Sequence, residues 1–111
     1  TISEIDVFDF KSNSWSTLAN PLPTQRAGTA SVGHFPYLIV MLGESIAQTG
    51  AHAEVEAVDV RTGVWVKFPS LNQGRHGTGV VIHHGKLFVA NGSANRGGGP
   101  ELNSIEMLNL K

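Results

Sequence analysis

The sequence contains no cysteine, which excludes disulfide bonds, thiolate metal sites and thiol catalysis. It has no marked excess of charge, because 8 Lys and Arg residues stand against 9 Asp and Glu residues. That balance excludes the broad basic surface with which proteins bind nucleic acids or acidic membranes. The longest apolar run, 35–42, is far shorter than the roughly 18 residues that a membrane helix requires. We therefore expect no nucleic-acid partner and no membrane partner.

Helix signals are almost absent as well, because Gly or Pro interrupts every stretch in which apolar residues recur at helical spacing. The chain instead contains 11 Val, 6 Ile and 13 Gly residues, a composition typical of short strands joined by tight turns. It begins with Thr1 and carries no recognisable targeting segment, so we expect a processed or cut start. The sequence therefore predicts an all-β fold.

A repeat with an offset of 50 residues runs through the chain. Residues 5–10, 55–60 and 105–110 share one pattern: apolar, acidic, apolar, apolar, Asp or Asn, apolar. The basic residue after each copy and the only two tryptophans keep the same offset: Lys11, Arg61 and Lys111, and Trp15 and Trp65.

A second register has an offset of 49 residues. It aligns Arg26-Ala27-Gly28-Thr29 with Arg75-His76-Gly77-Thr78 and continues as far as Gly43 and Gly92. Because the two offsets differ by one residue, successive repeats differ in length by one residue between a Trp and the Arg that follows it. Two interlocked registers are hard to obtain by chance, so we interpret the chain as an array of repeats.

Each period contains four apolar stretches that we expect to be β-strands, at about 27–33, 37–43, 55–60 and 64–68. Turn residues separate these stretches. A short acidic or amide side chain before a turn can accept hydrogen bonds from the N–H groups of that turn. The expected turns are 11–13, 34–36, 61–63 and 83–85, and the residues expected to precede turns of this kind are Asp9, Asp59 and Asn109.

Four antiparallel strands in about 50 residues describe one blade of a β-propeller. The residues resemble kelch repeats, with Arg entering strand one, Gly ending strand two, an acidic-apolar strand three and Trp on strand four. Residues 75–78 followed by 95–99 also resemble galactose-oxidase-like kelch proteins. The pattern departs from the family at the end of strand two, where Gly43-Glu44 and Gly92-Ser93 stand in place of a double glycine.

The expected strands leave the ring of blades incomplete. We expect nine strands, about two and a quarter blades: strands three and four of a first blade in 1–20, one complete blade in 21–70, and strands one to three of a further blade in 71–111. All belong to one propeller domain. Because the first and last strands are both third strands, they cannot complete each other. We expect either a piece of a larger propeller or an assembly whose remaining blades come from the same or another chain.

Two arginines are the first candidates for a binding site. The resemblance implies that Arg26 and Arg75 line the mouth of the central channel and contact acidic ligands, and a guanidinium suits a carboxylate partner. The alternative is a structural arginine bonded to blade carbonyls or to a neighbouring carboxylate. His76, beside Arg75, is the best further polar candidate near the mouth.

The loops between strands two and three are the longest connections, 44–54 and 93–102. Binding residues often lie on loops that a rigid scaffold holds. The resemblance implies that both loops share a face with the two arginines; the alternative is that they are ordinary variable loops. The candidate ligand-binding residues here are Ser45, Ser93, Asn95 and Arg96.

No metal, cofactor or catalytic centre is expected. Copper-radical oxidases of this fold use a cysteine-linked tyrosine and a second tyrosine, whereas this chain has only Tyr37 and no Cys. No Ser/His/Asp set surrounds a strand-to-helix turn, so a nucleophilic triad is not supported. The histidines form no cluster at the spacing of metal ligands: they are His34, His52, His76, His83 and His84.

We therefore expect a non-catalytic binding scaffold whose channel-mouth loops hold a protein or carbohydrate partner. The alternative is a fragment of a galactose-oxidase-like enzyme whose catalytic residues lie elsewhere. Trp15 and Trp65 are expected to pack between blades rather than to form exposed sugar platforms. Asn91-Gly92-Ser93 is a glycosylation acceptor sequence, which fits an extracellular protein.

Overall fold

The computed structural model describes residues 1–110, so Lys111, which the repeat aligned with Lys11 and Arg61, lies outside the described residues. Within this range the chain forms eleven β-strands and no helix, which confirms the all-β prediction. No helix in the described part of the chain could cross a membrane. The strands are β1 (Asp6–Asp9), β2 (Ser14–Thr17), β3 (Ala30–His34), β4 (Tyr37–Met41), β5 (Val55–Asp59), β6 (Trp65–Phe68), β7 (Val80–His83), β8 (Lys86–Ala90), β9 (Ser93–Asn95), β10 (Gly98–Glu101) and β11 (Ile105–Asn109).

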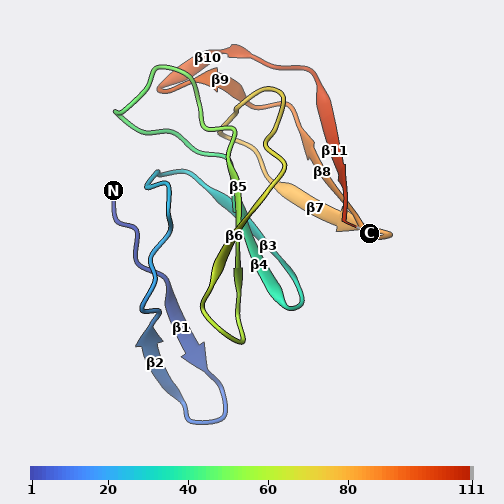
Figure 1. The fold of residues 1–111 in the computed structure, drawn as a ribbon. Coiled ribbons are helices and arrows are strands. Elements are labelled where there is room, and N and C mark those ends of the chain that lie inside the picture. The colour runs from blue at the N-terminus through green and yellow to red at the C-terminus, as the bar shows by residue number, and fades with distance from the viewer. Residues whose placement is uncertain (111) are drawn as a thin grey trace.

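A four-stranded antiparallel sheet in the order β3-β4-β5-β6 occupies the middle of the chain (Figure 1). Its two central strands are the most apolar and the most buried, with Ile39 and Met41 on β4 and Ala57 and Val58 on β5 all inaccessible to solvent. The four strands fall where the repeat predicted them. The first is shorter than expected: Gly28 has a φ of +65°, and before Ala30 only an isolated bridge joins Ala27 to Glu44.

A second, three-stranded antiparallel sheet has the order β11-β8-β7, with β7 next to β3 of the first sheet. The hydrophobic core lies between the two sheets. It joins side chains of β4 and β5 with two side chains of β8, so the sheets are held face to face by apolar burial. The core residues are Ile39, Met41, Leu42, Val55, Ala57, Leu87 and Val89.

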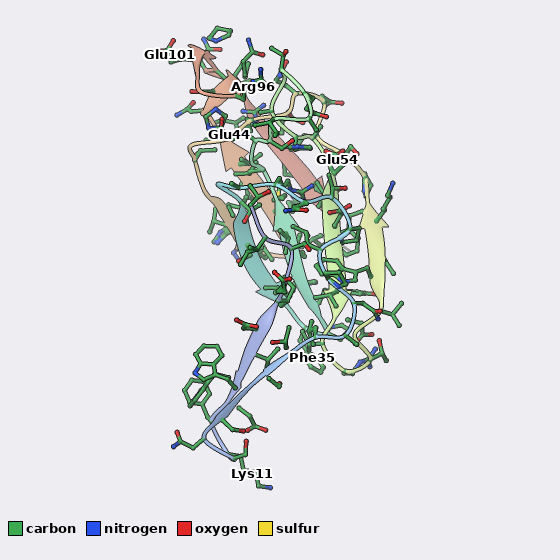
Figure 2. The ribbon with its side chains drawn as sticks, turned by 90° about the vertical axis from the view of Figure 1, so that its left-hand side faces the viewer. Lys11, Phe35, Glu44, Glu54, Arg96 and Glu101 are labelled. Carbon is green, nitrogen blue, oxygen red and sulfur yellow. The ribbon has the colours of Figure 1, made fainter. Side chains whose placement is uncertain are left out.

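The hairpin of β1 and β2 projects away from both sheets and contacts no other strand of the described chain (Figures 1 and 2). The indole of Trp15 is therefore 69% exposed and touches only its own hairpin, where its ring centroid lies 5.2 Å from that of Phe8. The expected burial of Trp15 between blades is not found among the described residues, because none of their other sheets covers the hairpin. Trp65 is half-buried, and its Nε1 donates a hydrogen bond to the Asn20 carbonyl at 2.9 Å.

The turns account for the chain reversals that the repeat predicted and for the one hairpin that it did not predict. Oδ1 of Asp9 and of Asp59 accepts a backbone N–H bond two residues on, at 2.8 and 2.9 Å. His84 and Gly85, between β7 and β8, both have positive φ, as a two-residue hairpin turn requires. The expectation of nine strands is wrong, because residues 93–102 fold into a β9–β10 hairpin whose short strands of mostly small and polar residues carry no alternating pattern.

Two valines on adjacent strands test the position of the core. Val89→Ala should lower the free energy of unfolding by about 1–3 kcal/mol, because it removes buried methyl groups from between the sheets. Val81→Ala makes the same chemical change at a side chain that is 57% exposed, and should cost well under about 1 kcal/mol. Urea unfolding measures both; equal losses would contradict this placement of the core.

Candidate functional site

The connections that follow β4 and β8 meet at one end of the molecule, which we call the loop face and define as residues 44–54 and 93–102. In Figure 2, Glu44, Arg96 and Glu101 lie at this end, and Phe35 lies toward the opposite end. Backbone hydrogen bonds join the two loops: Ala51 N–H donates to the Ala94 carbonyl at 2.8 Å, and Arg96 N–H donates to the Thr49 carbonyl at 2.9 Å. The loop face is therefore a connected backbone structure formed by two repeats.

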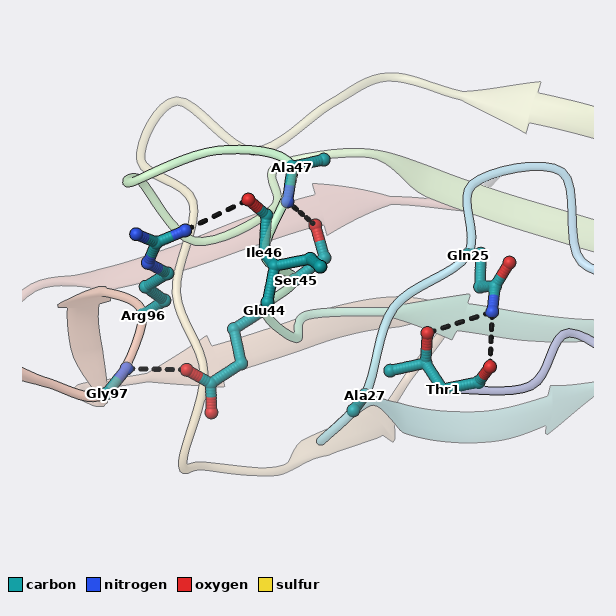
Figure 3. Close-up of a pocket in the computed structure, with 9 residues that line it drawn as sticks. All are labelled: Thr1, Gln25, Ala27, Glu44, Ser45, Ile46, Ala47, Arg96 and Gly97. Atoms are coloured by element: carbon teal, nitrogen blue, oxygen red, sulfur yellow. Dashed lines mark hydrogen bonds between the residues drawn. The ribbon is translucent and has the colours of Figure 1, made fainter.

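A groove of about 780 Å³ opens on the loop face (Figure 3). Polar contacts cross it from one repeat to the next. Arg96 Nη1 donates to the Ile46 carbonyl at 3.0 Å, and Gly97 N–H donates to Glu44 Oε2 at 2.6 Å. The side chain of Ile46 beside these contacts is 95% exposed. The residues that line the groove are Thr1, Gln25, Ala27, Glu44, Ser45, Ile46, Ala47, Arg96 and Gly97.

His76 supports the loop face from below. Its backbone exchanges two hydrogen bonds with Ser93, at 3.1 and 2.9 Å. Its Nε2 donates to the Asn95 carbonyl at 2.7 Å, and its Nδ1 lies 3.6 Å from Glu44 Oε1. The imidazole is 14% exposed, so it fixes β9 beneath the groove more than it offers a surface to a ligand.

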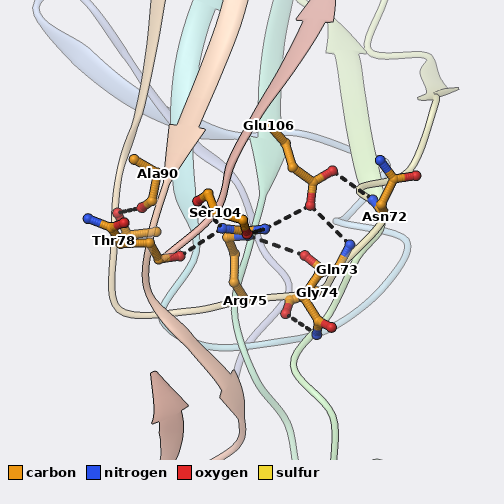
Figure 4. A network of polar contacts seen from close by, with 9 residues as sticks. Asn72, Gln73, Gly74, Arg75, Thr78, Ala90, Ser104 and Glu106 are labelled. Carbon is orange, nitrogen blue, oxygen red and sulfur yellow. Dashed lines mark hydrogen bonds and ion pairs between the residues drawn. The ribbon is translucent and has the colours of Figure 1, made fainter. Parts of the chain in front are cut away.

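Arg75 is fully buried, and its guanidinium is bonded on every side (Figure 4). Nε donates to the Gln73 carbonyl at 3.2 Å, and Nη1 donates to the carbonyls of Asn91 and Ser104 at 2.9 and 3.0 Å. Nη2 donates to Ser104 Oγ at 3.1 Å and to Glu106 Oε2 at 2.8 Å. Of the two readings that the sequence allowed, the geometry favours the structural one.

Arg26 occupies the equivalent place in the preceding repeat and is 3% exposed. Its Nη2 donates to the Val40 carbonyl at 3.2 Å, and its Nη1 lies 3.4 Å from Glu56 Oε1. Glu56 in turn accepts from the N–H and the hydroxyl of Thr24, at 3.2 and 2.7 Å. Burial lowers the pKa of Arg26, and the charge of Glu56 acts against that shift. Nε and Nη1 of Arg26 have no hydrogen-bond partner among the described residues, so this copy is less completely bonded than Arg75.

The partners of the two arginines were missed from the sequence. Glu56 and Glu106 hold the acidic position of the 50-residue repeat, and each accepts backbone N–H bonds from the segment that leads to its arginine. A signal was present, because an arginine and a glutamate recur together at nearly equal separation, 26 to 56 and 75 to 106. A buried arginine also needs an anionic partner, which the acidic position supplies.

Two glycines allow this arrangement at equivalent places. Gly43 and Gly92 have φ of +113° and +91°, and a Cβ at either one would lie only 2.6 or 2.7 Å from a backbone carbonyl of the arginine-containing segment. That contact lets the end of strand two cross closely over the start of strand one. The single glycine kept in each repeat is therefore the one that the close approach requires.

The structure also brings together a set that the sequence did not predict. Ser45 Oγ lies 2.8 Å from His52 Nε2, and His52 Nδ1 donates to Glu54 Oε1 at 3.0 Å. A strand-to-helix turn is the usual setting of a nucleophilic triad, whereas these residues lie on one long connection. Among the described residues no group of three or more His, Cys, Asp or Glu side chains could hold a metal ion.

The predicted site residues thus separate into two layers. Ser45, Asn95 and Arg96 lie on the loop face, as does Ser93 at its base, and the predicted direct contact of these residues with a ligand stays a prediction. Arg26, Arg75 and His76 lie beneath and hold the loops.

The comparisons with known proteins agree with this architecture. The Kelch-like protein terF of Aspergillus terreus is 27% identical over 93 residues, and Kelch-like protein 40 of Xenopus tropicalis is 30% identical over 93 residues. The matches cover 82% and 84% of this chain but only 20% and 15% of those proteins. The solved structure of YjhT superposes on 74% of this chain and 25% of its own, with a TM-score of 0.63 and 24% sequence identity. No protein-family model matches the chain.

The chain is built of kelch-type β-propeller repeats. Its sheets are the open blades of such a propeller, and the ring is not closed by the described residues. In this kelch chain the buried arginine of each repeat binds backbone carbonyls and a glutamate, and the loop face lies above these arginines.

The buried arginine of the kelch repeat gives a direct test. Arg75→Ala should lower the free energy of unfolding by roughly 3–5 kcal/mol, because three carbonyls and Glu106 lose their donor. Arg61→Ala removes an arginine that also pairs with a carboxylate but is 60% exposed, and should cost far less stability than Arg75→Ala, because solvent screens an exposed ion pair. The measurement is urea unfolding at neutral pH. Similar losses in the two variants would contradict the structural role of Arg75.

Glu106 predicts an acid-dependent loss of stability. Desolvation acts to raise the pKa of Glu106, but hydrogen bonds from the Asn72 and Gln73 N–H groups and from Arg75 outweigh it and hold the pKa below its usual value. The resulting stabilisation is present above the unfolded-state pKa of about 4.3 and disappears as pH falls through the lower folded-state pKa. The difference in unfolding free energy between wild type and Glu106→Gln should therefore shrink across that acid range.

The control for this titration is Glu101→Gln, which removes one carboxylate at an exposed position of the loop face. A wild-type to Glu101→Gln difference that shrinks in the same way would point to a general loss of surface charge. A wild-type to Glu106→Gln difference that stays constant from neutral pH to about pH 3 would contradict the argument.

Proposed function

We propose that this chain is a binding scaffold that docks a protein partner on its loop face. Kelch propellers commonly bind proteins, and this role needs no catalytic group. The observation that carries the proposal is the exposed Ile46 beside a groove whose two walls are joined by the contacts of Arg96 and Gly97. A rigid, preorganised loop loses little conformational entropy on binding.

The chemistry of the loop face favours a protein over a carbohydrate. Neither 44–54 nor 93–102 contains Trp, Tyr or Phe, so the aromatic surfaces on which sugar rings stack are missing from both loops. Ile46 and Ala47 instead offer aliphatic surface, with Glu44 and Arg96 as charged groups at the groove. An apolar anchor bordered by charges is typical of protein interfaces.

The structure also supports an assignment of parts to the propeller. We propose residues 1–20 as the end of one blade, 21–70 as a complete blade and 71–111 as three strands of a further blade. The remaining blades come from the same or another chain. The support is the 2-, 4- and 3-stranded sheets in chain order, together with the exposed apolar residues Val7 and Trp15 of the first hairpin and Met107 of β11, which a neighbouring blade or strand would cover.

The oxidase alternative has no specific observation in its favour. Tyr37, the only tyrosine, packs edge-to-face on Phe68 with ring centroids 5.4 Å apart. It therefore fills the edge of the core instead of lying on the loop face.

A pair of matched substitutions tests the docking proposal. Ile46→Asp should weaken binding of a purified protein partner at least tenfold, because it places a charge where we expect an apolar anchor. Phe35→Asp makes the same kind of change at a side chain that is 78% exposed toward the opposite end, and should leave affinity unchanged (Figure 2). The partner is obtained by affinity capture with wild type, and each dissociation constant is measured by calorimetry.

Two results would contradict the proposal. Loss of binding in Phe35→Asp but not in Ile46→Asp would move the interface to the other end of the blades. Binding to glycans that Ile46→Asp leaves intact, without any protein partner, would favour the carbohydrate reading.

A further inference from the structure

A hydrogen-bonded relay of three side chains lies within the loop 44–54. Ser45 Oγ is 2.8 Å from His52 Nε2, and His52 Nδ1 is 3.0 Å from Glu54 Oε1. Ser45 lines the groove of the loop face, whereas the imidazole of His52 is only 4% exposed behind it. A hydroxyl that faces a groove, a histidine behind it and a carboxylate behind the histidine is the arrangement that activates a serine for nucleophilic attack.

Backbone contacts on several sides hold the relay in place. His52 N–H donates to the Gly43 carbonyl at 2.8 Å, and the flanking residues are bonded to two further segments, Ala51 N–H to the Ala94 carbonyl at 2.8 Å and Leu71 N–H to the Ala53 carbonyl at 2.9 Å. His52 and Glu54 are two residues apart, just before β5, and their side chains meet at 3.0 Å. The histidine therefore has little freedom to leave Ser45.

The carboxylate fixes the tautomer of the imidazole. Partial burial acts to raise the pKa of Glu54, but hydrogen bonds from its own backbone N–H and from His52 outweigh it and hold the pKa below its usual value. Glu54 is thus ionised at neutral pH and accepts the proton of His52 Nδ1. In the neutral imidazole Nε2 is then an acceptor, and the hydroxyl of Ser45 donates to it.

We propose that Ser45 is a nucleophile that accepts acyl groups from esters, with His52 as its general base and Glu54 as a positioning residue. Ser45 Oγ forms a bond to the carbonyl carbon of the ester, and its proton passes to His52 Nε2. The bond from that carbon to the alkoxy oxygen then breaks, and the alcohol leaves with the proton from His52. In the second half, His52 takes a proton from water while the water oxygen bonds to the acyl carbon. The bond from that carbon to Ser45 Oγ then breaks, the acid leaves, and His52 returns the proton to Ser45 Oγ.

The lining of the groove indicates which acyl groups suit the site, and the N–H donors near Ser45 indicate the rate to expect. Ile46 and Ala47 border Ser45, so an apolar acyl group suits the site better than a charged one. One N–H donor lies beside the nucleophile: Ala47 N–H points at Ser45 Oγ from 3.3 Å. An oxyanion donor must point at the carbonyl oxygen of the ester, whereas Ala47 N–H donates to Ser45 Oγ itself. Because loss of a single oxyanion donor slows efficient hydrolases by about 10²–10³-fold, we expect slow acylation.

The test is covalent labelling with an alkyl fluorophosphonate, read by mass spectrometry of the purified protein. Attack of Ser45 Oγ on phosphorus breaks the P–F bond, fluoride leaves, and His52 takes the proton. We expect one adduct, on Ser45, and none in Ser45→Ala. The matched control is Ser14→Ala: the Ser14 hydroxyl is also hydrogen-bonded, to Ser12 Oγ at 2.7 Å, but has no histidine beside it, so its loss should leave labelling unchanged.

The relay itself is tested at Glu54, whose side chain is 35% exposed and lies outside the hydrophobic core. Glu54→Gln should lower the labelling rate at least tenfold, and Glu54→Asp should recover part of it, while both keep the thermal midpoint of wild type. A purely structural relay would instead lower the midpoint and leave the rate unchanged. Labelling of Ser45 no faster than that of Ser14, or equal rates in wild type and Glu54→Gln, would overturn the proposal.

Discussion

The buried arginine–glutamate pair of each repeat is the interaction on which the rest of the structure depends. Arg75 joins the segment before β7, the end of β8 and the start of β11 at one point, and Glu106 closes the same point by accepting two backbone N–H bonds. A guanidinium without solvent is costly unless its donors are bonded. Chain segments far apart in the sequence must therefore converge on it, and they do so just beneath the loop face.

The buried arginine–glutamate pair also fixes the backbone from which the loop face starts. Gly43 and Gly92 cross close over the arginine-containing segments, at distances that admit no side chain. The loops that leave these glycines start from fixed positions, which is why Ser45 and His52 meet and why Ile46 is presented outward. In the proposed scaffold, buried charges stabilise the fold and the loop tips bind the partner, so the two roles fall on different residues.

The repeat pattern predicted most of the sheet order, because a period of alternating apolar strands and turn residues reports burial and chain reversal directly. It could not predict the β9–β10 hairpin, whose residues 93–101 are mostly small and polar and owe their pairing to contacts with 49–51. It gave Trp15 and Trp65 the same environment, although exposure depends on what covers each hairpin. The relay of Ser45, His52 and Glu54 carries no periodic signal, because it arises from how one irregular loop folds back on itself.

The two equivalent arginines are not bonded equally in the two repeats. Arg75 donates a hydrogen bond from each of its nitrogens, whereas among the described residues Nε and Nη1 of Arg26 have no hydrogen-bond partner, although Nη1 lies 3.4 Å from Glu56 Oε1. The same residue type therefore holds its surroundings more firmly in one repeat than in the other. The loop 44–54 lies above Arg26, the less completely bonded arginine. It is held in place by hydrogen bonds to Ala94, Arg96 and Gly97 of the next repeat. The groove is thus a property of a pair of adjacent repeats, whereas the relay of Ser45, His52 and Glu54 lies within a loop of one repeat that the next repeat holds in place.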